Sequence, residues 1–204
     1  MGVTDGEERM VGLLGGTFNP PHNGHLALAR AAKDRFPFDR FVVLVAARPG
    51  HKHVDLDAET RFRRAQAAFP GDEVELDPHE RTIDTLRAHD WGDPLFLIGA
   101  DQFFAFPTWK DPQRVLARAR LGVATRPGYT REPLDAVVDE LGAHDRVLFF
   151  EIEPLPISSR EVRERVERGE DVSGLVPPAV AGLISGLGLY RGYTAGQRED
   201  LTSR

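Results

Sequence analysis

The sequence predicts an α/β domain in which helices cover both faces of a doubly wound parallel sheet. Apolar runs of strand length alternate along the chain with amphipathic helical patterns. Most of the expected strands are strongly apolar, which is typical of strands that are buried on both faces of a sheet. With 204 residues, the chain is long enough for a single domain with a substantial core. We expect the ligand site to lie beyond the carboxyl ends of the strands.

Strands and helices are expected to alternate within one domain, residues 10–191. The strands are predicted at Val11–Leu14, Phe41–Ala46, Glu73–Leu76, Leu95–Ile98, Leu121–Ala124 and Val147–Phe150. The helices are predicted at Leu26–Phe36, Ala58–Phe69, Ile83–His89, Pro112–Ala119, Leu134–Leu141, Ser159–Arg168 and Pro178–Gly186. Residues 1–9 are polar and expected to be flexible, and residues 192–204 are expected to form a polar tail.

The composition is that of an ordinary soluble protein, with 41% hydrophobic and 28% charged residues. The net charge of −6 argues against nucleic acid as a partner. Because the chain has no cysteine, disulfides, thiol catalysis and zinc–thiolate sites are excluded. We see no signal peptide and no apolar run long enough to span a bilayer, so we expect a cytoplasmic protein without a membrane partner.

The turn after the first strand is the first candidate site, and it is expected to bind a phosphate. Residues 15–25 read Gly-Gly-Thr-Phe-Asn-Pro-Pro-His-Asn-Gly-His and lead into a helix. Gly15 and Gly16 allow a ligand to approach the backbone, and the N–H groups of the helix start suit an anion. His22 and His25, three residues apart, can face the same bound group. The alternatives are a tight turn before a capped helix, and a metal site, for which no clear third ligand is visible.

Further candidates follow the other strands. Lys52 lies in a basic loop that can reach a phosphate, and Thr82 is placed to cap the next helix. Gly99 allows close approach, and Asp101 can accept hydrogen bonds from a ribose. Trp109 follows a proline in a turn, where its ring could stack on a flat heterocycle. Each has a plainer alternative: a solvated loop, a helix cap or a core aromatic.

A second anion site is expected near the C-terminus, at residues 157–163, which read Ile-Ser-Ser-Arg-Glu-Val-Arg. Ser158 and Glu161 have the spacing of a capping box, so a helix begins here. The hydroxyls of Ser158 and Ser159 and the free N–H groups at this start suit an anion, and Arg163 can add a charge-assisted contact. The alternative is a capped helix with ordinary surface arginines.

These motifs together resemble those of the nucleotidylyltransferase superfamily. Residues 15–25 are similar to its His/Thr-x-Gly-His motif, and residues 157–163 to its Ile-Ser-Ser-Thr-x-Ile-Arg motif. Within it, residues 49–52 and 82–86 are similar to the Pro-Pro-His-Lys and Tyr-Thr-Ile-Asp-Thr-Leu segments of bacterial nicotinate mononucleotide adenylyltransferases. The resemblance covers residues 11–190 in the right order. Three positions differ from the family's pattern: Gly50, Arg81 and Arg160.

The resemblance implies a Rossmann-like nucleotidyltransferase fold and transfer of AMP from ATP to nicotinic acid mononucleotide. The products would be deamido-NAD and pyrophosphate, and Mg²⁺ would be bound through the ATP phosphates with no metal site of the protein's own. The implied catalytic residues are His22, His25, Lys52 and Arg163. The implied ATP-binding residues are Gly15, Gly16, Thr17, Phe18, His22, His25, Gly99, Asp101, Ser158, Ser159 and Arg163. The implied acceptor-binding residues are Asn19, Lys52, Thr82, Ile83, Trp109 and Arg126.

Three alternative functions stay open on the sequence alone. Nicotinamide mononucleotide or phosphopantetheine could be the acceptor, although Trp109 and Thr82 favour a pyridine nucleotide. The domain could also bind nucleotide without catalysis, against which the intact His22, His25 and Arg163 argue. An oxidoreductase is the third alternative, but the glycine pattern does not fit the dinucleotide fingerprint of that class. The oligomeric state is left open, a homo-oligomer included.

Overall fold

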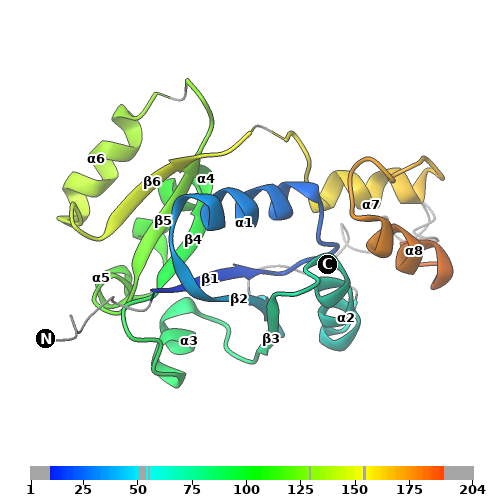
Figure 1. Ribbon diagram of the computed structural model, residues 1–204, viewed down its shortest axis with the longest axis horizontal. Helices are drawn as coiled ribbons and strands as arrows, with labels where there is room; N and C mark the ends of the chain where they lie inside the picture. The colour runs from blue at the N-terminus through cyan, green and yellow to red at the C-terminus, as the bar shows by residue number, and fades with distance from the viewer. Residues whose placement is uncertain (1–9, 51–53, 55, 129, 154, 191–204) are drawn as a thin grey trace, which may run out of the picture.

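The computed structural model describes residues 10–50, 54, 56–128, 130–153 and 155–190. In these residues, six parallel strands form one sheet with helices on both faces (Figure 1). The strands are β1 (Met10–Gly16), β2 (Phe38–Ala46), β3 (Glu73–Asp77), β4 (Leu95–Gly99), β5 (Arg120–Thr125) and β6 (Val147–Glu151). Each begins and ends within three residues of its predicted bounds. The predicted doubly wound, single-domain α/β fold is confirmed.

The strand order is β3-β2-β1-β4-β5-β6, and every neighbouring pair is parallel. The chain runs outward from β1 to β3 on one side and returns to pair β4 with β1 on the other. The order therefore reverses between β1 and β4. In open α/β sheets, ligands bind in the crevice outside the carboxyl ends of the strands at such a point. The turn that follows β1 lies at this crevice.

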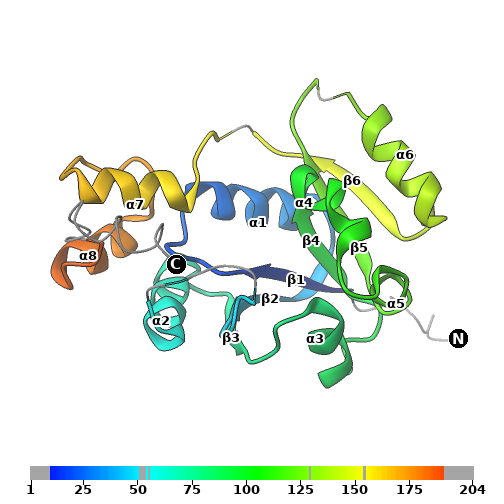
Figure 2. The same cartoon turned by 180° about the vertical axis from the view of Figure 1, so that it is seen from behind.

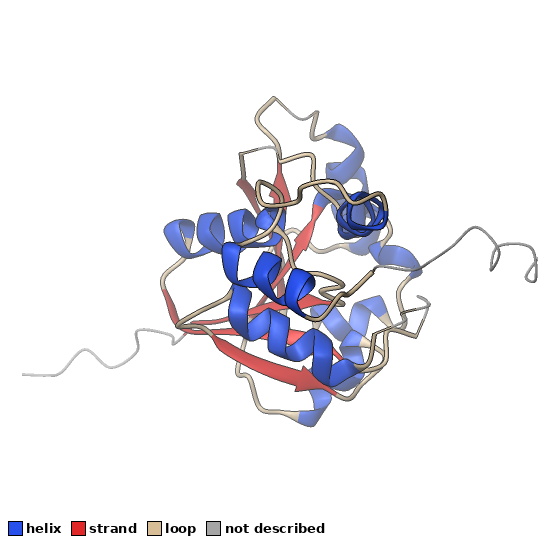
Figure 3. Cartoon of the chain, turned by 90° about the vertical axis from the view of Figure 1, so that its right-hand side faces the viewer, coloured by secondary structure: helices blue, strands red, loops and turns tan. Residues whose placement is uncertain are grey.

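Helices cover the two faces of the sheet, as Figure 3 shows with strands in red and helices in blue. They are α1 (Asn23–Arg35), α2 (Ala58–Ala68), α3 (Thr82–Ala88), α4 (Ala100–Phe104), α5 (Pro112–Leu116), α6 (Glu132–Leu141), α7 (Ser159–Glu167) and α8 (Pro178–Gly186), with a 3-10 turn, η1 (Phe106–Thr108). All seven predicted helices are present. The helix α4 and the turn η1 were not predicted, because each is too short to show a helical period.

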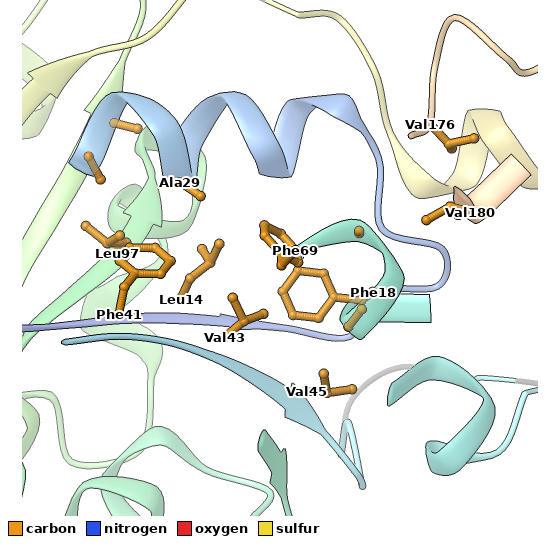
Figure 4. Close-up of a cluster of buried hydrophobic side chains, with 14 of the residues drawn as sticks. Leu14, Phe18, Ala29, Phe41, Val43, Val45, Phe69, Leu97, Val176 and Val180 are labelled. Carbon is orange, nitrogen blue, oxygen red and sulfur yellow. The ribbon is translucent and has the colours of Figure 1, made fainter. Parts of the chain in front are cut away.

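Two hydrophobic clusters fill the space on either side of the sheet. Along β1, Leu13 faces the cluster formed with α3, α5 and α6, whereas Leu14 faces the one formed with α1, α2, α7 and α8. Figure 4 shows Leu14 and Val43 of the second cluster beneath α1. Because neighbouring residues point to opposite faces of a strand, burial on both faces accounts for the apolar character of central strands such as β1 and β4.

The helices α7 and α8 lie side by side with α2 at one end of the molecule, in the front view and from behind (Figures 1 and 2). The chain thus returns from β6 to the region where β1 ends. No helix in the described parts of the chain is long and apolar enough to cross a membrane. The segments predicted to be flexible, residues 1–9 and 192–204, lie outside the described residues, and the domain limits at 10 and 191 stay a prediction.

Candidate functional site

The turn between β1 and α1 brings His22 and His25 face to face. His22 is the residue that precedes α1, and its side chain is only 8% exposed. Its backbone N–H donates to Nδ1 of His25 at 3.1 Å, and the two ring centroids lie 3.7 Å apart. The expected pairing of the two histidines at the helix start is therefore present.

The surroundings of His22 favour a neutral imidazole, and the backbone contact of His25 determines which ring nitrogen can accept a hydrogen bond. Burial lowers the pKa of His22 from 6.5 to about 4, because the apolar surroundings disfavour its charged form. Nδ1 of His22 is buried without a hydrogen-bond partner. Since Nδ1 of His25 accepts the bond from the backbone, the proton of a neutral His25 ring resides on Nε2. Nε2 of His25 is then a donor suited to a phosphate oxygen.

The glycines of this turn accommodate rings of the protein itself. A Cβ at Gly15 would lie 2.9 Å from the ring of Phe96, and one at Gly16 would lie 2.8 Å from the ring of Phe18. Close backbone approach, which we expected for a ligand, is here required by packing. The side chain of Phe18 is 1% exposed, so any contact of Phe18 with a nucleotide must come from its backbone. Thr17 is half-buried, and its carbonyl is held by a buried arginine, Arg61.

Gly24 is a residue of the site whose role the sequence analysis missed. A Cβ at this position would lie 3.0 Å from Nδ1 and 3.1 Å from Cε1 of His22. The His22 ring therefore packs over the backbone of Gly24, and a larger residue would displace it. The His-Asn-Gly-His spacing could have indicated this role, because a residue between two paired histidines has little space for a side chain of its own.

The start of α7 lies against the same turn, which joins the two predicted anion sites. Ser158 caps the helix, accepting the backbone N–H of Glu161 at 3.1 Å, as the spacing predicted. The Ser159 hydroxyl donates to the carbonyl of Pro20 at 2.8 Å, and Nη1 of Arg163 donates to the carbonyl of Asn19 at 2.7 Å. These bonds connect residues about 140 positions apart in the chain.

The acceptor-side candidates on α3 are placed differently from the prediction. Arg81, and not Thr82, is the residue that precedes the helix, so the predicted cap at Thr82 is wrong. A second threonine, Thr85, instead donates its hydroxyl to Asp77 at 2.6 Å, which fixes α3 to the end of β3. The side chain of Ile83 is fully buried, so only its backbone can meet a ligand.

The remaining candidates follow β4 and β5. Asp101 is exposed in the first turn of α4, and its carboxylate would lie 2.8 Å from a Cβ at Gly99. Trp109 is half-buried, with its ring centroid 5.2 Å from that of Phe106. Arg126 is exposed directly after β5, with no hydrogen bond or ion pair to the other candidates in the described residues.

Lys110 joins the Trp109 segment to α3, because its Nζ lies 3.4 Å from Oδ2 of Asp84. The candidate Lys52 lies outside the described residues, so its predicted contact stays a prediction. Within the described ranges, no group of three or more His, Cys, Asp or Glu side chains is placed to hold a metal ion.

A family model described as cytidylyltransferase-like matches residues 13–165, from β1 into α7. The chain belongs to the cytidylyltransferase-like family. It is 36% identical over 202 residues to the "Probable nicotinate-nucleotide adenylyltransferase" of Bordetella pertussis, which covers 94% of this chain and 100% of that protein. The protein of the same name from Rubrobacter xylanophilus is 32% identical over 209 residues, which covers 94% of this chain and 96% of that protein.

A solved structure has the same fold at low sequence identity. Plasmodium falciparum nicotinic acid mononucleotide adenylyltransferase complexed with NaAD matches this chain with a TM-score of 0.70 at 16% identity, covering 89% of this chain and 97% of that one. The family and the Rossmann-like nucleotidyltransferase fold that the motifs predicted are therefore confirmed.

Proposed function

We propose that this protein transfers the AMP part of ATP to nicotinic acid mononucleotide, giving deamido-NAD and pyrophosphate in NAD biosynthesis. Its family supports nucleotidyl transfer as the class of reaction, and relatives that align over nearly the whole chain are named nicotinate-nucleotide adenylyltransferases. The observation that carries the proposal is the contact between the two helix starts. Ser159 and Arg163 of α7 bond directly to the turn that presents His22.

The two helix starts are suited to hold the triphosphate of ATP. The start of α1 offers the positive end of its dipole, although the N–H groups of Asn23 and His25 already donate to the carbonyls of Leu175 and His22. His25 adds the donor on Nε2, and neutral His22 can donate without the desolvation cost of a buried cation. Ser158 accepts one bond as a helix cap and keeps its own hydroxyl proton to donate. Arg163 uses one nitrogen for the turn and has further N–H groups for phosphate oxygens.

The reaction needs no strong base. The acceptor phosphate attacks the α-phosphorus of ATP in line, the bond from the α-phosphorus to the bridging oxygen breaks, and pyrophosphate leaves. A phosphate monoester is largely ionised at neutral pH, because its second pKa is about 6. The protein therefore contributes positioning and stabilisation of the negative charge that grows on the phosphates.

Mg²⁺ fits this site as part of the ATP complex. The described residues offer no cluster of acidic ligands, and a triphosphate with water supplies the oxygen ligands that Mg²⁺ prefers. When bound, the ion would neutralise charge on the phosphates. The hydroxyl of Ser158 and the further N–H groups of Arg163 could hold oxygens that the ion does not use.

The acceptor is assigned to the space between α3 and Trp109. The half-buried Trp109 ring can stack on a pyridine ring. The backbone N–H groups of Thr82 and Ile83 lie in the first turn of the neighbouring helix α3. Lys110, which contacts Asp84 of α3, joins the two segments. A cytoplasmic location, with ATP and nicotinic acid mononucleotide as the small-molecule partners, belongs to this proposal.

The test is pyrophosphate release from ATP and Mg²⁺ with nicotinic acid mononucleotide, nicotinamide mononucleotide and phosphopantetheine offered in parallel. The proposal predicts release that strongly favours the nicotinic acid form. Release with phosphopantetheine alone, or with none of the three in a protein that binds ATP, would overturn it. His25→Ala should abolish most of the signal, whereas His144→Ala removes an exposed imidazole after α6 and should keep it.

A further inference from the structure

Two buried arginines lie behind the β1–α1 turn. The side chains of Arg61 and Arg64, both on α2, are each 1% exposed. Among the described residues, neither forms an ion pair with an acidic side chain. Arg61 instead donates to the carbonyls of Thr17, Ala46 and Ala47, at 2.9, 2.6 and 3.0 Å, and its Nε donates to the carbonyl of Leu56 at 3.2 Å. Burying an arginine is costly unless its donors are used, so this pair must serve the fold or the site.

Arg64 leads directly to the turn through one phenol. Its Nη1 donates to the hydroxyl oxygen of Tyr190, and the guanidinium carbon lies 5.4 Å from the centroid of the Tyr190 ring. The Tyr190 hydroxyl donates in turn to Oδ1 of Asn19 at 2.8 Å. Burial raises the pKa of Tyr190, against the pull of Arg64, so the phenol keeps the proton that it donates.

The chemistry of the three groups gives this chain of bonds one direction. A guanidinium can only donate, so the phenol oxygen accepts from it and the phenol proton must find an acceptor elsewhere. Oδ1 of Asn19 is that acceptor, which fixes the orientation of the Asn19 amide. The backbone carbonyl of the same residue accepts Nη1 of Arg163. Asn19 is therefore held from two sides.

The bonds connect residues that lie far apart in the chain. They join Arg64 to Tyr190 over 126 positions, Tyr190 to Asn19 over 171, and Arg163 to Asn19 over 144. Figures 1 and 2 show α2, α7 and α8 gathered at this end of the molecule. The β1–α1 turn is therefore connected to Tyr190, which follows α8.

We propose that Tyr190 and Arg64 are positioning residues for ATP, which act through Asn19 to hold the β1–α1 turn in the shape that binds the triphosphate. The proposal rests on the proposed function only in assigning ATP to this turn, and the identity of the acceptor does not enter it. Neither side chain touches the ligand. Their effect is on the turn that carries His22 and His25.

The test begins with Tyr190→Phe, which keeps the ring and removes the hydroxyl. Binding of a non-hydrolysable ATP analogue with Mg²⁺, measured by calorimetry without acceptor, should weaken roughly tenfold, the scale of one hydrogen bond. The KM for the acceptor should change less than about threefold, and the thermal midpoint should fall by no more than about 4 °C. Ser173→Ala, which removes a hydroxyl that donates to Asp171, should leave all three values unchanged.

Variants of Arg64 provide the second arm. Arg64→Met removes the donor and should weaken the analogue as Tyr190→Phe does, whereas Arg64→Lys keeps a donor and should restore binding to within about threefold of the native protein. In the Arg64→Met background, Tyr190→Phe should cause little further loss of analogue binding, because both substitutions act through the same bond.

The outcomes separate this inference from the proposed function. A Tyr190→Phe protein that is destabilised but binds the analogue normally would show a purely structural role and overturn the inference, while leaving the proposed function intact. A native protein that binds the analogue but makes no deamido-NAD would overturn the proposed acceptor. The binding data would still decide the inference on Tyr190 and Arg64. A native protein that does not bind the analogue would overturn both.

Discussion

Replacing His22 by Asn should remove about 3 kcal/mol of the loss of stability that the protein suffers between pH 7 and pH 4. Burial lowers the pKa of His22 from 6.5 to about 4 in the folded protein. Between these two values the unfolded chain binds a proton that the folded protein does not, so stability falls as the pH falls. A difference of roughly 2.5 pKa units corresponds to about 3 kcal/mol, which is lost almost fully by pH 4.

The measurement is the free energy of unfolding from urea denaturation at several pH values, for the native protein and His22→Asn. Above pH 7 the native protein gains nothing from this group, since the imidazole is neutral in both states. The two pH profiles should therefore be parallel above pH 7. Below pH 7 the native protein should lose more free energy of unfolding than His22→Asn, by about 3 kcal/mol at pH 4. His144→Asn is the matched control, because it removes an exposed imidazole. Identical slopes for the native protein and His22→Asn below pH 6 would refute the buried, neutral His22.

Three further predictions concern other parts of the site. His25→Ala should lower kcat by at least about a hundredfold, the scale of one lost transition-state donor, and near-native turnover in the folded variant would contradict that role. Arg61→Met leaves three backbone carbonyls at the strand ends without their donor, so the free energy of unfolding from urea denaturation should fall by about 3 kcal/mol. A fall below about 1 kcal/mol would mean that water replaces the guanidinium. Trp109→Ala should raise the KM for the acceptor several-fold with little change in the KM for ATP, and an unchanged acceptor KM would place the ring in the core alone.

The fold was predictable because its signals are local. Most of the six strands contain a continuous apolar run, whereas the edge strand β3 alternates polar and apolar residues. Their neighbours are helices with a clear period or a capping residue such as Ser158. The helix α4 and the turn η1 escaped prediction because the aromatic residues Phe103 and Phe106 are buried by tertiary packing and follow no helical repeat. The cap at Thr82 was misplaced by one residue, because α3 is preceded by Arg81, which makes no side-chain cap that the sequence could signal.

The site was predictable only as separate pieces. The spacing of His22 and His25 and the two serines of α7 indicated anion sites, but their contact depends on bonds between residues about 140 positions apart. The buried Arg61 and Arg64 could not be foreseen, because arginine on an amphipathic helix is ordinarily exposed. Only the fold shows that one holds the strand ends and the other holds Tyr190.

The most direct test of the proposed reaction uses ATP labelled at the α-phosphorus, with nicotinic acid mononucleotide and Mg²⁺. We expect the label to appear in deamido-NAD in amounts equal to the pyrophosphate released, with the pyrophosphate itself unlabelled. His25→Ala should suppress both products together. Label that remains in ADP, or transfer of a γ-label to the mononucleotide, would show phosphoryl transfer in place of adenylyl transfer and would contradict the account.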